Sequence, residues 1–385
     1  MTRRILLAFA LIGFCVACSA ESGPDDACRV QHLDLAHHAE GEKQLEALAE
    51  GARHRHGVYM ATLALGSPAQ DLDAIIDTGS ANLVVMGADC VGCVSVDYRP
   101  SASSTAQDQS VDFSLQYGSA SLAAKLVKDL TGLPCGERVE ATFGVATEVA
   151  HLPASILGLA YAPLAAPANA PVQPWFDAMV EAGVFQDLFS LRLCGPGRPG
   201  SHLKLGGVDP AVDLDEVNYA AVVEERYYAV APPTFSIGGA TLGSGAATTI
   251  VDSGTTLMLV PYAVHEALVA QLKAAAQQAQ LSDKIPDGLW TSSATDISVR
   301  AKLTPAEVAK FPALTLRFTG EEGAFDLQVP PERYLRRTSS AGVYLGVRPG
   351  QAMTILGQVF MEGRHVVFDR GQRRLGFIAA NACGE

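Results

Sequence analysis

Positive charge is scarce in this sequence. Its 385 residues include 28 Lys and Arg against 41 Asp and Glu, which gives a formal net charge of −13 at pH 7. A surface of this sign repels the phosphates of DNA and RNA, so we expect no nucleic-acid partner. The acidic excess otherwise indicates a well solvated surface.

Motifs of several enzyme classes are also missing. No Gly-x-Ser-x-Gly turn occurs, which argues against the usual serine hydrolase nucleophile. His265-Glu266 could begin the helix of a zinc protease, but Val269 stands where the second His ligand is needed. The Gly-rich turns at Gly238-Gly239 and 243–245 lack the Lys of a phosphate-binding loop. We therefore expect no metal and no cofactor.

Long apolar runs are limited to the N-terminus. Arg3 and Arg4 precede an apolar run over residues 5–17, which is about the length of a signal sequence and too short to span a bilayer as a mature helix. No later stretch is long and apolar enough to span one. We predict a signal peptide over residues 1–17 and an exported protein, in which disulfides are possible.

The end of this run contains a candidate lipidation site. Cys15-Val16-Ala17-Cys18 resembles the signal of bacterial lipoproteins, in which small residues precede a lipidated Cys, although Cys15 stands where Leu is usual. On this interpretation Cys18 carries the lipid and is the only membrane contact, and Ser19 resembles the residue that sends lipoproteins to the outer membrane. We then expect an outer-membrane or periplasmic lipoprotein. The alternative is an ordinary signal peptide cleaved near Ala20 and a secreted protein.

The composition of the rest of the chain changes at position 57. Residues 18–56 are polar and form either a lipidated tether or a short propeptide-like leader. From position 57 onward, short apolar or alternating runs are separated by Gly, Pro and Asp, which is typical of strands and tight turns. Helical periodicity is clear only over 175–182 and 261–280. We therefore predict a mainly β protein, long enough for two cores, with lobes at 57–210 and 211–385.

An internal repeat supports the division into two lobes. Ile76-Asp77-Thr78-Gly79-Ser80 lies between two apolar runs, and so does Val251-Asp252-Ser253-Gly254-Thr255. Each is followed by a second matching segment, Ser155-Ile156-Leu157-Gly158 and Thr354-Ile355-Leu356-Gly357 respectively. Two copies of one unit predict two lobes related by an approximate twofold axis.

The repeated turns contain the groups needed to hold a carboxylate. Gly permits a tight turn in which its N–H points at the preceding carboxylate, and the hydroxyl one residue later can donate to the same group. If the two turns meet on the twofold axis, Asp77 and Asp252 lie within hydrogen-bond distance and share one proton. One carboxyl can then activate a water while the other protonates a peptide carbonyl. The alternative is that both are simple Asp-initiated turns between strands.

At this point the sequence resembles the pepsin-like aspartic peptidase family, over about residues 57–385. Both Asp motifs match, and Gln116-Tyr117-Gly118-Ser119 resembles the tip of the family's flap. The resemblance implies a bilobal, mainly β fold with pseudo-twofold symmetry and a flap hairpin. The C-terminal half is most similar to the memapsin (beta-secretase) branch, through Met361-Glu362-Gly363 and the segment 285–290.

The resemblance implies a role for each matched residue. Asp77 and Asp252 are the expected catalytic carboxylates. Substrate binding is expected from Tyr117 and Gly118 on one side and from Gly254 and Thr256 on the other. The residues expected to orient the carboxylates are Thr78, Gly79, Ser80, Ser253, Gly254 and Thr255.

Three features depart from the family pattern. Val84 stands where many members have a Trp that bonds the flap Tyr, although the memapsin branch also lacks that Trp. The flap has no further Gly directly after Gly118. The leader is short for a pepsin-type propeptide, so it either masks the cleft or serves only as a tether.

Six Cys remain after Cys15 and Cys18, and they allow fifteen disulfide connectivities. The family resemblance implies Cys194 with Cys383 and a small loop closed by Cys90 and Cys93, which leaves Cys28 with Cys135. The Cys90-x-x-Cys93 pair could instead be a redox pair or half of a zinc site.

The leading hypothesis is therefore an acid-active aspartic endopeptidase, acting as a monomer on peptide or protein substrates. A second hypothesis is a pepsin-like fold that binds peptides or proteins without cleaving them. A third is a glycoside hydrolase, whose two carboxylates usually lie farther apart than this repeat predicts.

Overall fold

The structure is a computed structural model that describes residues 31–34, 36–37, 58–118, 120–134, 136–196, 198–210, 212–291, 298–337, 342–350, 352–379 and 383. The predicted signal peptide, the lipidation site at Cys18 and the pairing of Cys28 with Cys135 lie outside these residues. Within them, no helix is both long enough and apolar enough to cross a bilayer.

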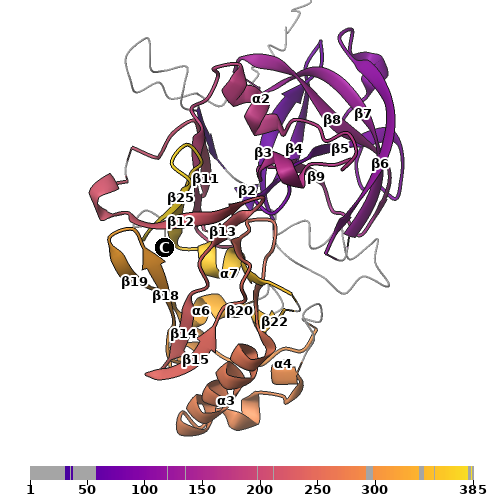
Figure 1. The fold of residues 1–385 in the computed structure, drawn as a ribbon. Helices are drawn as coiled ribbons and strands as arrows, with labels where there is room; N and C mark the ends of the chain where they lie inside the picture. The colour runs from indigo at the N-terminus through magenta and orange to yellow at the C-terminus, as the bar shows by residue number, and fades with distance from the viewer. Residues whose placement is uncertain are drawn as a thin grey trace, which may run out of the picture.

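The N-terminal lobe is built on an eight-stranded sheet (Figure 1). Alternating apolar residues direct one face of these strands into the core, as in β3, where Tyr59, Ala61 and Leu63 are buried. In sheet order the strands are β2 (Ala36–His37), β3 (Tyr59–Leu65), β4 (Gln70–Asp77), β9 (Ser155–Gly158), β5 (Leu83–Val91), β8 (Arg138–Ala150), β7 (Ala120–Gly132) and β6 (Gln107–Tyr117).

An eleven-stranded sheet runs from the junction of the lobes into the C-terminal half. In sheet order its strands are β1 (Gln31–Asp34), β11 (His202–Leu205), β10 (Leu188–Leu193), β24 (Arg364–Asp369), β25 (Arg374–Ala379), β12 (Asn218–Glu225), β13 (Tyr228–Val230), β16 (Thr249–Val251), β23 (Thr354–Leu356), β17 (Met258–Val260) and β22 (Val347–Pro349). Because β10 and β11 precede the predicted boundary at residue 210, the two halves of the chain share this sheet.

Smaller elements complete the C-terminal lobe. A four-stranded sheet contains, in sheet order, β15 (Ala240–Ser244), β14 (Thr234–Ile237), β18 (Leu314–Gly320) and β19 (Gly323–Val329). In a separate pair, β20 (Leu335–Arg337) lies beside β21 (Val343–Leu345). The helices are α2 (Trp175–Glu181) in the N-terminal lobe, and α3 (Tyr262–Gln278), α4 (Gly288–Thr291), α5 (Pro305–Val308), α6 (Pro331–Tyr334) and α7 (Gln358–Met361) in the C-terminal lobe.

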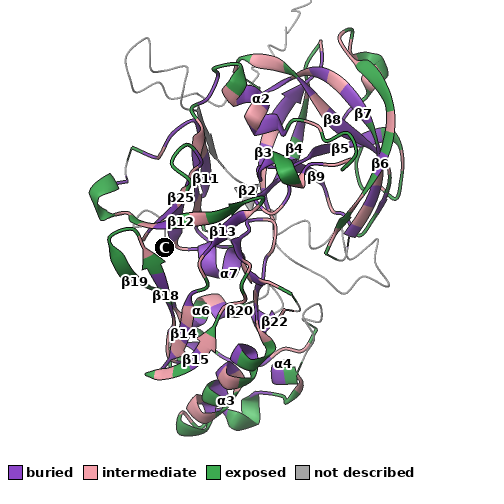
Figure 2. Cartoon of the chain, in the orientation of Figure 1, coloured by how far each residue is buried: buried purple, intermediate pink, exposed green. Residues whose placement is uncertain are grey.

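Both predicted helices are present with nearly the predicted bounds, as α2 and α3. Helix α3 buries Val264, Leu268, Leu272 and Ala276, which recur every fourth residue along one face. Figure 2 shows this alternation of buried and exposed residues along α3. Pro261 lies one residue before the helix and serves as its N-cap.

The internal repeat becomes the same three-strand unit in each lobe. In the first, β4 runs parallel to β9 and β9 runs antiparallel to β5. In the second, β16 runs parallel to β23 and β23 runs antiparallel to β17. The fold is thus the bilobal, pseudo-symmetric fold of pepsin-like aspartic proteases, as the repeat predicted.

Part of the leader is built into the body of the protein. Strand β1 pairs antiparallel with β11, and β2 pairs antiparallel with β3. The sequence did not predict these strands. They attach these parts of the leader to the eleven-stranded and the eight-stranded sheet, so these parts are not a free tether.

Two disulfides join described residues. One closes the small loop from Cys90 to Cys93, and the other ties Cys383 back to Cys194 at the end of β10. Both are pairs that the family resemblance implied.

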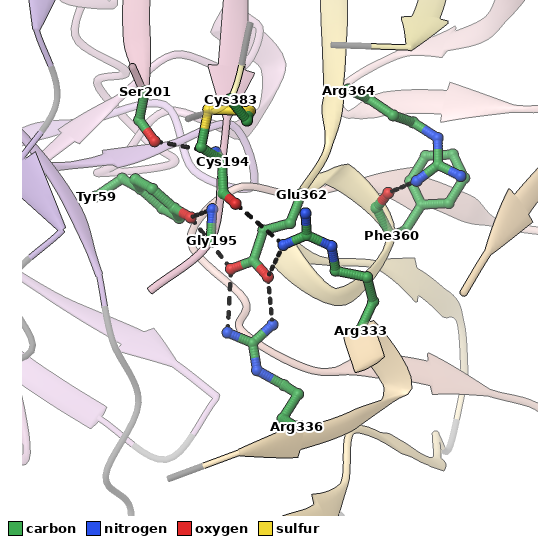
Figure 3. Close-up of polar contacts among 10 residues, drawn as sticks. All are labelled: Tyr59, Cys194, Gly195, Ser201, Arg333, Arg336, Phe360, Glu362, Arg364 and Cys383. Atoms are coloured by element: carbon green, nitrogen blue, oxygen red, sulfur yellow. Dashed lines mark hydrogen bonds and ion pairs between the residues drawn. A yellow bond between two sulfur atoms is a disulfide. The ribbon is translucent and has the colours of Figure 1, made fainter. Parts of the chain in front are cut away.

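A buried network of charges also crosses between the lobes (Figure 3). Tyr59 on β3 donates from its hydroxyl to Glu362 Oε1 at 3.1 Å and accepts a hydrogen bond from the Gly195 N–H at 2.9 Å. Arg336 holds both oxygens of Glu362, at 2.9 and 3.0 Å. Arg333 donates to the Cys194 carbonyl at 3.1 Å and lies 3.6 Å from Glu362 Oε2. Glu362 directly follows α7, so the network anchors that helix.

Candidate active site

Asp77 ends β4 at the bottom of the junction between the lobes and is only 8% exposed. The Gly79 N–H donates to Asp77 Oδ1 at 2.9 Å, and the Ser80 hydroxyl donates to Oδ2 at 2.5 Å. Each carboxylate oxygen therefore has its own donor. Strand β4 lies between β3 and β9 in the sheet, so the carboxylate is held on a rigid element.

Asp252 repeats this arrangement from the second lobe. It follows β16 and is 6% exposed. The Gly254 N–H donates to Asp252 Oδ1 at 2.8 Å, and the Thr255 hydroxyl donates to Oδ2 at 2.5 Å. The two sites thus use equivalent atoms at equivalent positions of the repeat.

The two loops are locked together beneath the carboxylates by Thr78 and Ser253. The Thr78 hydroxyl donates to the Val251 carbonyl at 3.0 Å and accepts from the Ser253 N–H at 3.0 Å. The Ser253 hydroxyl donates to the Ile76 carbonyl at 2.7 Å and accepts from the Thr78 N–H at 3.1 Å. All of these groups are buried, so their hydrogen bonds cannot be exchanged for water without cost.

The two carboxyl groups lie close to one another. A Cβ on Gly79 would lie 2.6 Å from Asp252 Cγ, and one on Gly254 would lie 2.4 Å from Asp77 Oδ1. Only Gly allows the loops this approach. Burial, and then the charge of Asp252, raise the pKa of Asp77 to about 7 against the hydrogen bonds from Ser80 and Gly79. The pair can therefore retain a proton where an ordinary Asp has lost it.

The main chain beneath each loop is supported by residues at the end of the second matching segment of each repeat. The Leu159 N–H donates to the Asp77 carbonyl and the Ala160 N–H to the Ser80 carbonyl, both at 2.8 Å. In the other lobe the Gln358 N–H donates to the Thr255 carbonyl at 2.8 Å. These bonds explain why each Asp motif needs its later partner segment.

The flap is the hairpin of β6 and β7, with Tyr117 and Gly118 at its tip. Gly118 has φ of +48°, a left-handed conformation that Gly adopts without strain. The Tyr117 hydroxyl is buried and has no hydrogen-bond partner among the residues that the structure describes. Burial, and then the charge of Asp77, raise the pKa of Tyr117, which places this side chain near the carboxylates.

Val84 lies in the apolar cluster beneath the flap, together with Phe113 and Leu122. Tyr117 packs against the same cluster. With Val at position 84, apolar contact rather than a hydrogen bond from Trp positions the flap tyrosine.

The expected substrate-binding residues divide into two groups. Tyr117 and Gly118 come from the flap, while Gly254 and Thr256 come from the second catalytic loop, where Thr256 is 5% exposed. These residues therefore come from elements of different lobes.

Sequence reasoning missed several residues that support the site. Gln116 donates from Nε2 to the Gly118 and Ala120 carbonyls, at 3.2 and 3.0 Å, and so braces the flap tip. Gln358 is fully buried and donates to the Ser253 carbonyl at 3.0 Å. The Tyr228 hydroxyl donates to the Leu159 carbonyl at 2.6 Å. No local motif marks Gln358 or Tyr228, because each acts on a segment far away in the sequence. Gln116 stands in the flap segment that the family resemblance singled out, but its contacts were not predicted.

Comparison with known proteins agrees with this geometry. Residues 58–380 match the family described as eukaryotic aspartyl protease. The chain belongs to the pepsin-like aspartic protease family. The match covers both lobes and both carboxylate loops, and therefore nearly all of the described structure.

Individual relatives of this aspartic protease are about equally distant. A beta-secretase of Strongylocentrotus purpuratus is 30% identical over 380 residues, covering 88% of this chain and 70% of that protein. Cathepsin D of Rattus norvegicus is 29% identical, covering 84% of this chain and 80% of that protein. Gastricsin of Homo sapiens is 29% identical, covering 87% of this chain and 85% of that protein. These values indicate a distant member that retains the full two-lobed length.

Proposed function

We propose that this protein is an active aspartic endopeptidase with Asp77 and Asp252 as its catalytic pair. The observation that carries the proposal is the equivalent support of two adjacent carboxylates, each with one Gly N–H and one hydroxyl donor. A fold that had lost catalysis would have no need to keep both donor sets.

The geometry supports a general acid–base mechanism. Two adjacent carboxyls that share one proton provide a base and an acid at the same site. The ionised carboxyl removes a proton from a water, which attacks the peptide carbonyl carbon, while the protonated carboxyl donates to the carbonyl oxygen. The carboxyl that took the proton of the water then donates it to the nitrogen, the C–N bond breaks, and a hydroxyl of the intermediate returns a proton to the other carboxylate as the new carbonyl forms. The rigid loops hold both carboxyls in position throughout.

The proposed substrate is an extended peptide that lies between the flap and the second loop. Tyr117 and Gly118 would cover it, and Gly254 and Thr256 would contact its backbone from the other side. We propose that a single chain is sufficient, since both carboxylates come from one chain.

A digest of a peptide library at several pH values, with and without pepstatin, tests this function directly. Pepstatin mimics the tetrahedral intermediate, so we expect cleavage that it inhibits. Tight binding of peptides with no cleavage at any pH would instead establish the catalytically silent binding module.

The pH dependence of the reaction follows from the raised pKa of Asp77. Because the folded-state pKa is about 7, the shared proton is retained at acidic pH and lost as the pH rises through neutrality. We expect kcat/KM to be highest at acidic pH and to fall about tenfold per pH unit well above the pKa, where the acid is deprotonated. Steady-state kinetics with one peptide across this range gives the profile, and circular dichroism at each pH separates lost chemistry from unfolding. A rate that rises into the alkaline range would contradict the mechanism.

We further propose that the protein is exported and that Cys18 carries a lipid anchor. The two disulfides and the apolar segment at residues 5–17 support export. In a bacterial host, the Cys18→Ala variant should lose incorporation of labelled palmitate and move from the membrane to the soluble fraction, while Cys15→Ala should keep both. Equal labelling of wild type and Cys18→Ala would favour the ordinary signal peptide.

A further inference from the structure

Two buried histidines share one face of the sheet at the lobe junction, away from the catalytic loops. His202 lies on β11 and His365 on β24, and Arg192 on the strand between them is the register partner of both. Residues paired across neighbouring strands point to the same face. His202 is 0% exposed and His365 4% exposed.

A buried carboxylate completes the group. Asp209, in the turn after β11, is 9% exposed, and its Oδ2 lies 2.9 Å from His202 Nε2. The two imidazole rings meet edge to face, with a centroid distance of 5.7 Å and an angle of 60° between their planes. One ligand atom from each of the three residues lies within 4.8 Å of the others.

One polar atom in this group has no partner in the described structure. His365 Nδ1 is buried without a hydrogen bond. An unsatisfied buried nitrogen costs about 1–3 kcal/mol, so it requires an explanation. A ligand that binds nitrogen at this position would supply one.

We propose that His202, Asp209 and His365 form a structural site for a divalent transition metal ion, with Zn²⁺ as the best fit. Two imidazoles and one carboxylate are a donor set that Zn²⁺ prefers, with the fourth position left for water. In a tetrahedral site two atoms bound to one Zn²⁺ lie about 3.3–3.6 Å apart, since each bond is about 2.0–2.2 Å, so the widest separation must shorten by roughly 1.3 Å. The observed separations of up to 4.8 Å therefore require a side-chain rotation.

The charges around the site set its expected affinity. Arg192 Nη1 lies 3.6 Å from Asp209 Oδ2, and Lys204 is close enough to feel the charge of Asp209. Arg192 thus lies outside the proposed ligands, contacts the Asp209 carboxylate and limits its rotation. The positive charges of Arg192 and Lys204 repel a metal cation. We therefore expect weaker metal binding than at a closed site with four protein ligands.

A metal here would stabilise the junction rather than take part in peptide hydrolysis. It would link β11 and the turn at Asp209 to β24, and in the described sheet β11 and β24 lie on opposite sides of β10 and each pairs with it. This site is independent of the proposed peptidase chemistry, which uses only the two carboxyls and water.

Zinc binding by the full chain tests the proposal. After dialysis against a chelator, the protein is titrated with ZnCl₂ in competition with a chromophoric chelator, and its thermal unfolding is measured with and without the ion. We expect one Zn²⁺ per chain and an unfolding temperature raised by a few degrees at saturating Zn²⁺. Absence of stoichiometric binding would overturn the proposal and leave a proton shared between His202 and Asp209.

Matched variants locate the ion. His365→Gln should weaken Zn²⁺ binding at least about a hundredfold, because it removes a ligand. His265→Gln is the control, since His265 on α3 is also a buried histidine whose Nε2 has no partner in the described residues, and it should bind Zn²⁺ as the wild type does. Equal loss in both variants, or in neither, would contradict the assignment.

A measurement on the wild type keeps the proposal testable if the variants do not fold. X-ray absorption at the zinc edge should show two imidazole nitrogens and only nitrogen or oxygen ligands. A spectrum with sulfur ligands would place the ion at cysteines instead and would overturn the site.

Discussion

Replacing Asp77 by Asn lowers kcat/KM at least about 10⁴-fold, because an amide can neither accept a proton from water nor share one with Asp252. The side chain keeps its shape, and the loop stays locked through Thr78 and Ser253. At neutral pH the variant should be at least as stable as the wild type, since Asn removes the repulsion between two buried carboxylates. Peptide cleavage and urea unfolding measure the two effects.

Asp71→Asn is the matched control for this experiment. It makes the same chemical change on the same strand, β4, at an exposed position away from the cleft. We expect wild-type cleavage from this control, and from Asp252→Asn the same loss as from Asp77→Asn. An Asp77→Asn enzyme that cleaves as fast as the wild type would rule out the proposed mechanism.

Replacing Glu362 by Gln destabilises the protein by about 3–5 kcal/mol, because it leaves buried Arg336 without its counter-ion. Tyr59 keeps an acceptor, so the effect reports mainly on the lost charge. Because Glu362 follows α7, and the Gln358 N–H in that helix supports the Thr255 carbonyl, cleavage activity should fall as well. The midpoint of urea unfolding gives the loss of stability.

Two further variants separate this explanation from a general effect of Glu removal. Glu332→Gln changes an exposed Glu on α6 near the same network and should leave the midpoint unchanged. The double variant Glu362→Leu with Arg336→Met removes both charges, and should recover most of the stability that Glu362→Gln loses. A double variant as unstable as Glu362→Gln would show that the charge itself is not the cause.

The proposed catalytic pair was the most predictable part of the molecule. Asp77 and Asp252 each stand in a short segment whose Gly and hydroxyl residues act within three positions along the chain. Local geometry therefore determines how each carboxylate is held. The repeat adds the symmetry, since two copies of one strand–turn–strand unit pair with their later segments in the same way.

The supporting contacts were less predictable, for a physical reason. Tyr59 and Glu362 are separated by 303 positions, and Gln358 and Ser253 by 105. Such contacts depend on how strands from both halves assemble, and a single Tyr, Glu or Gln has no periodicity that reveals its partner. The pairing of the leader through β1 and β2 was missed because its strands are too short for an alternating pattern to stand out.

The sequence by itself determined that the chain is mainly β, two-lobed and equipped with two equivalent carboxylate turns. These features arise from residues close together in the chain, where turn geometry and alternation act directly. Only the tertiary structure decided that Gly79 and Gly254 each pack against the opposite carboxyl, and that burial and the charge of Asp252 raise the pKa of Asp77. It alone also brought His202, Asp209 and His365 together, because sheet order, not sequence order, sets which side chains share a buried face.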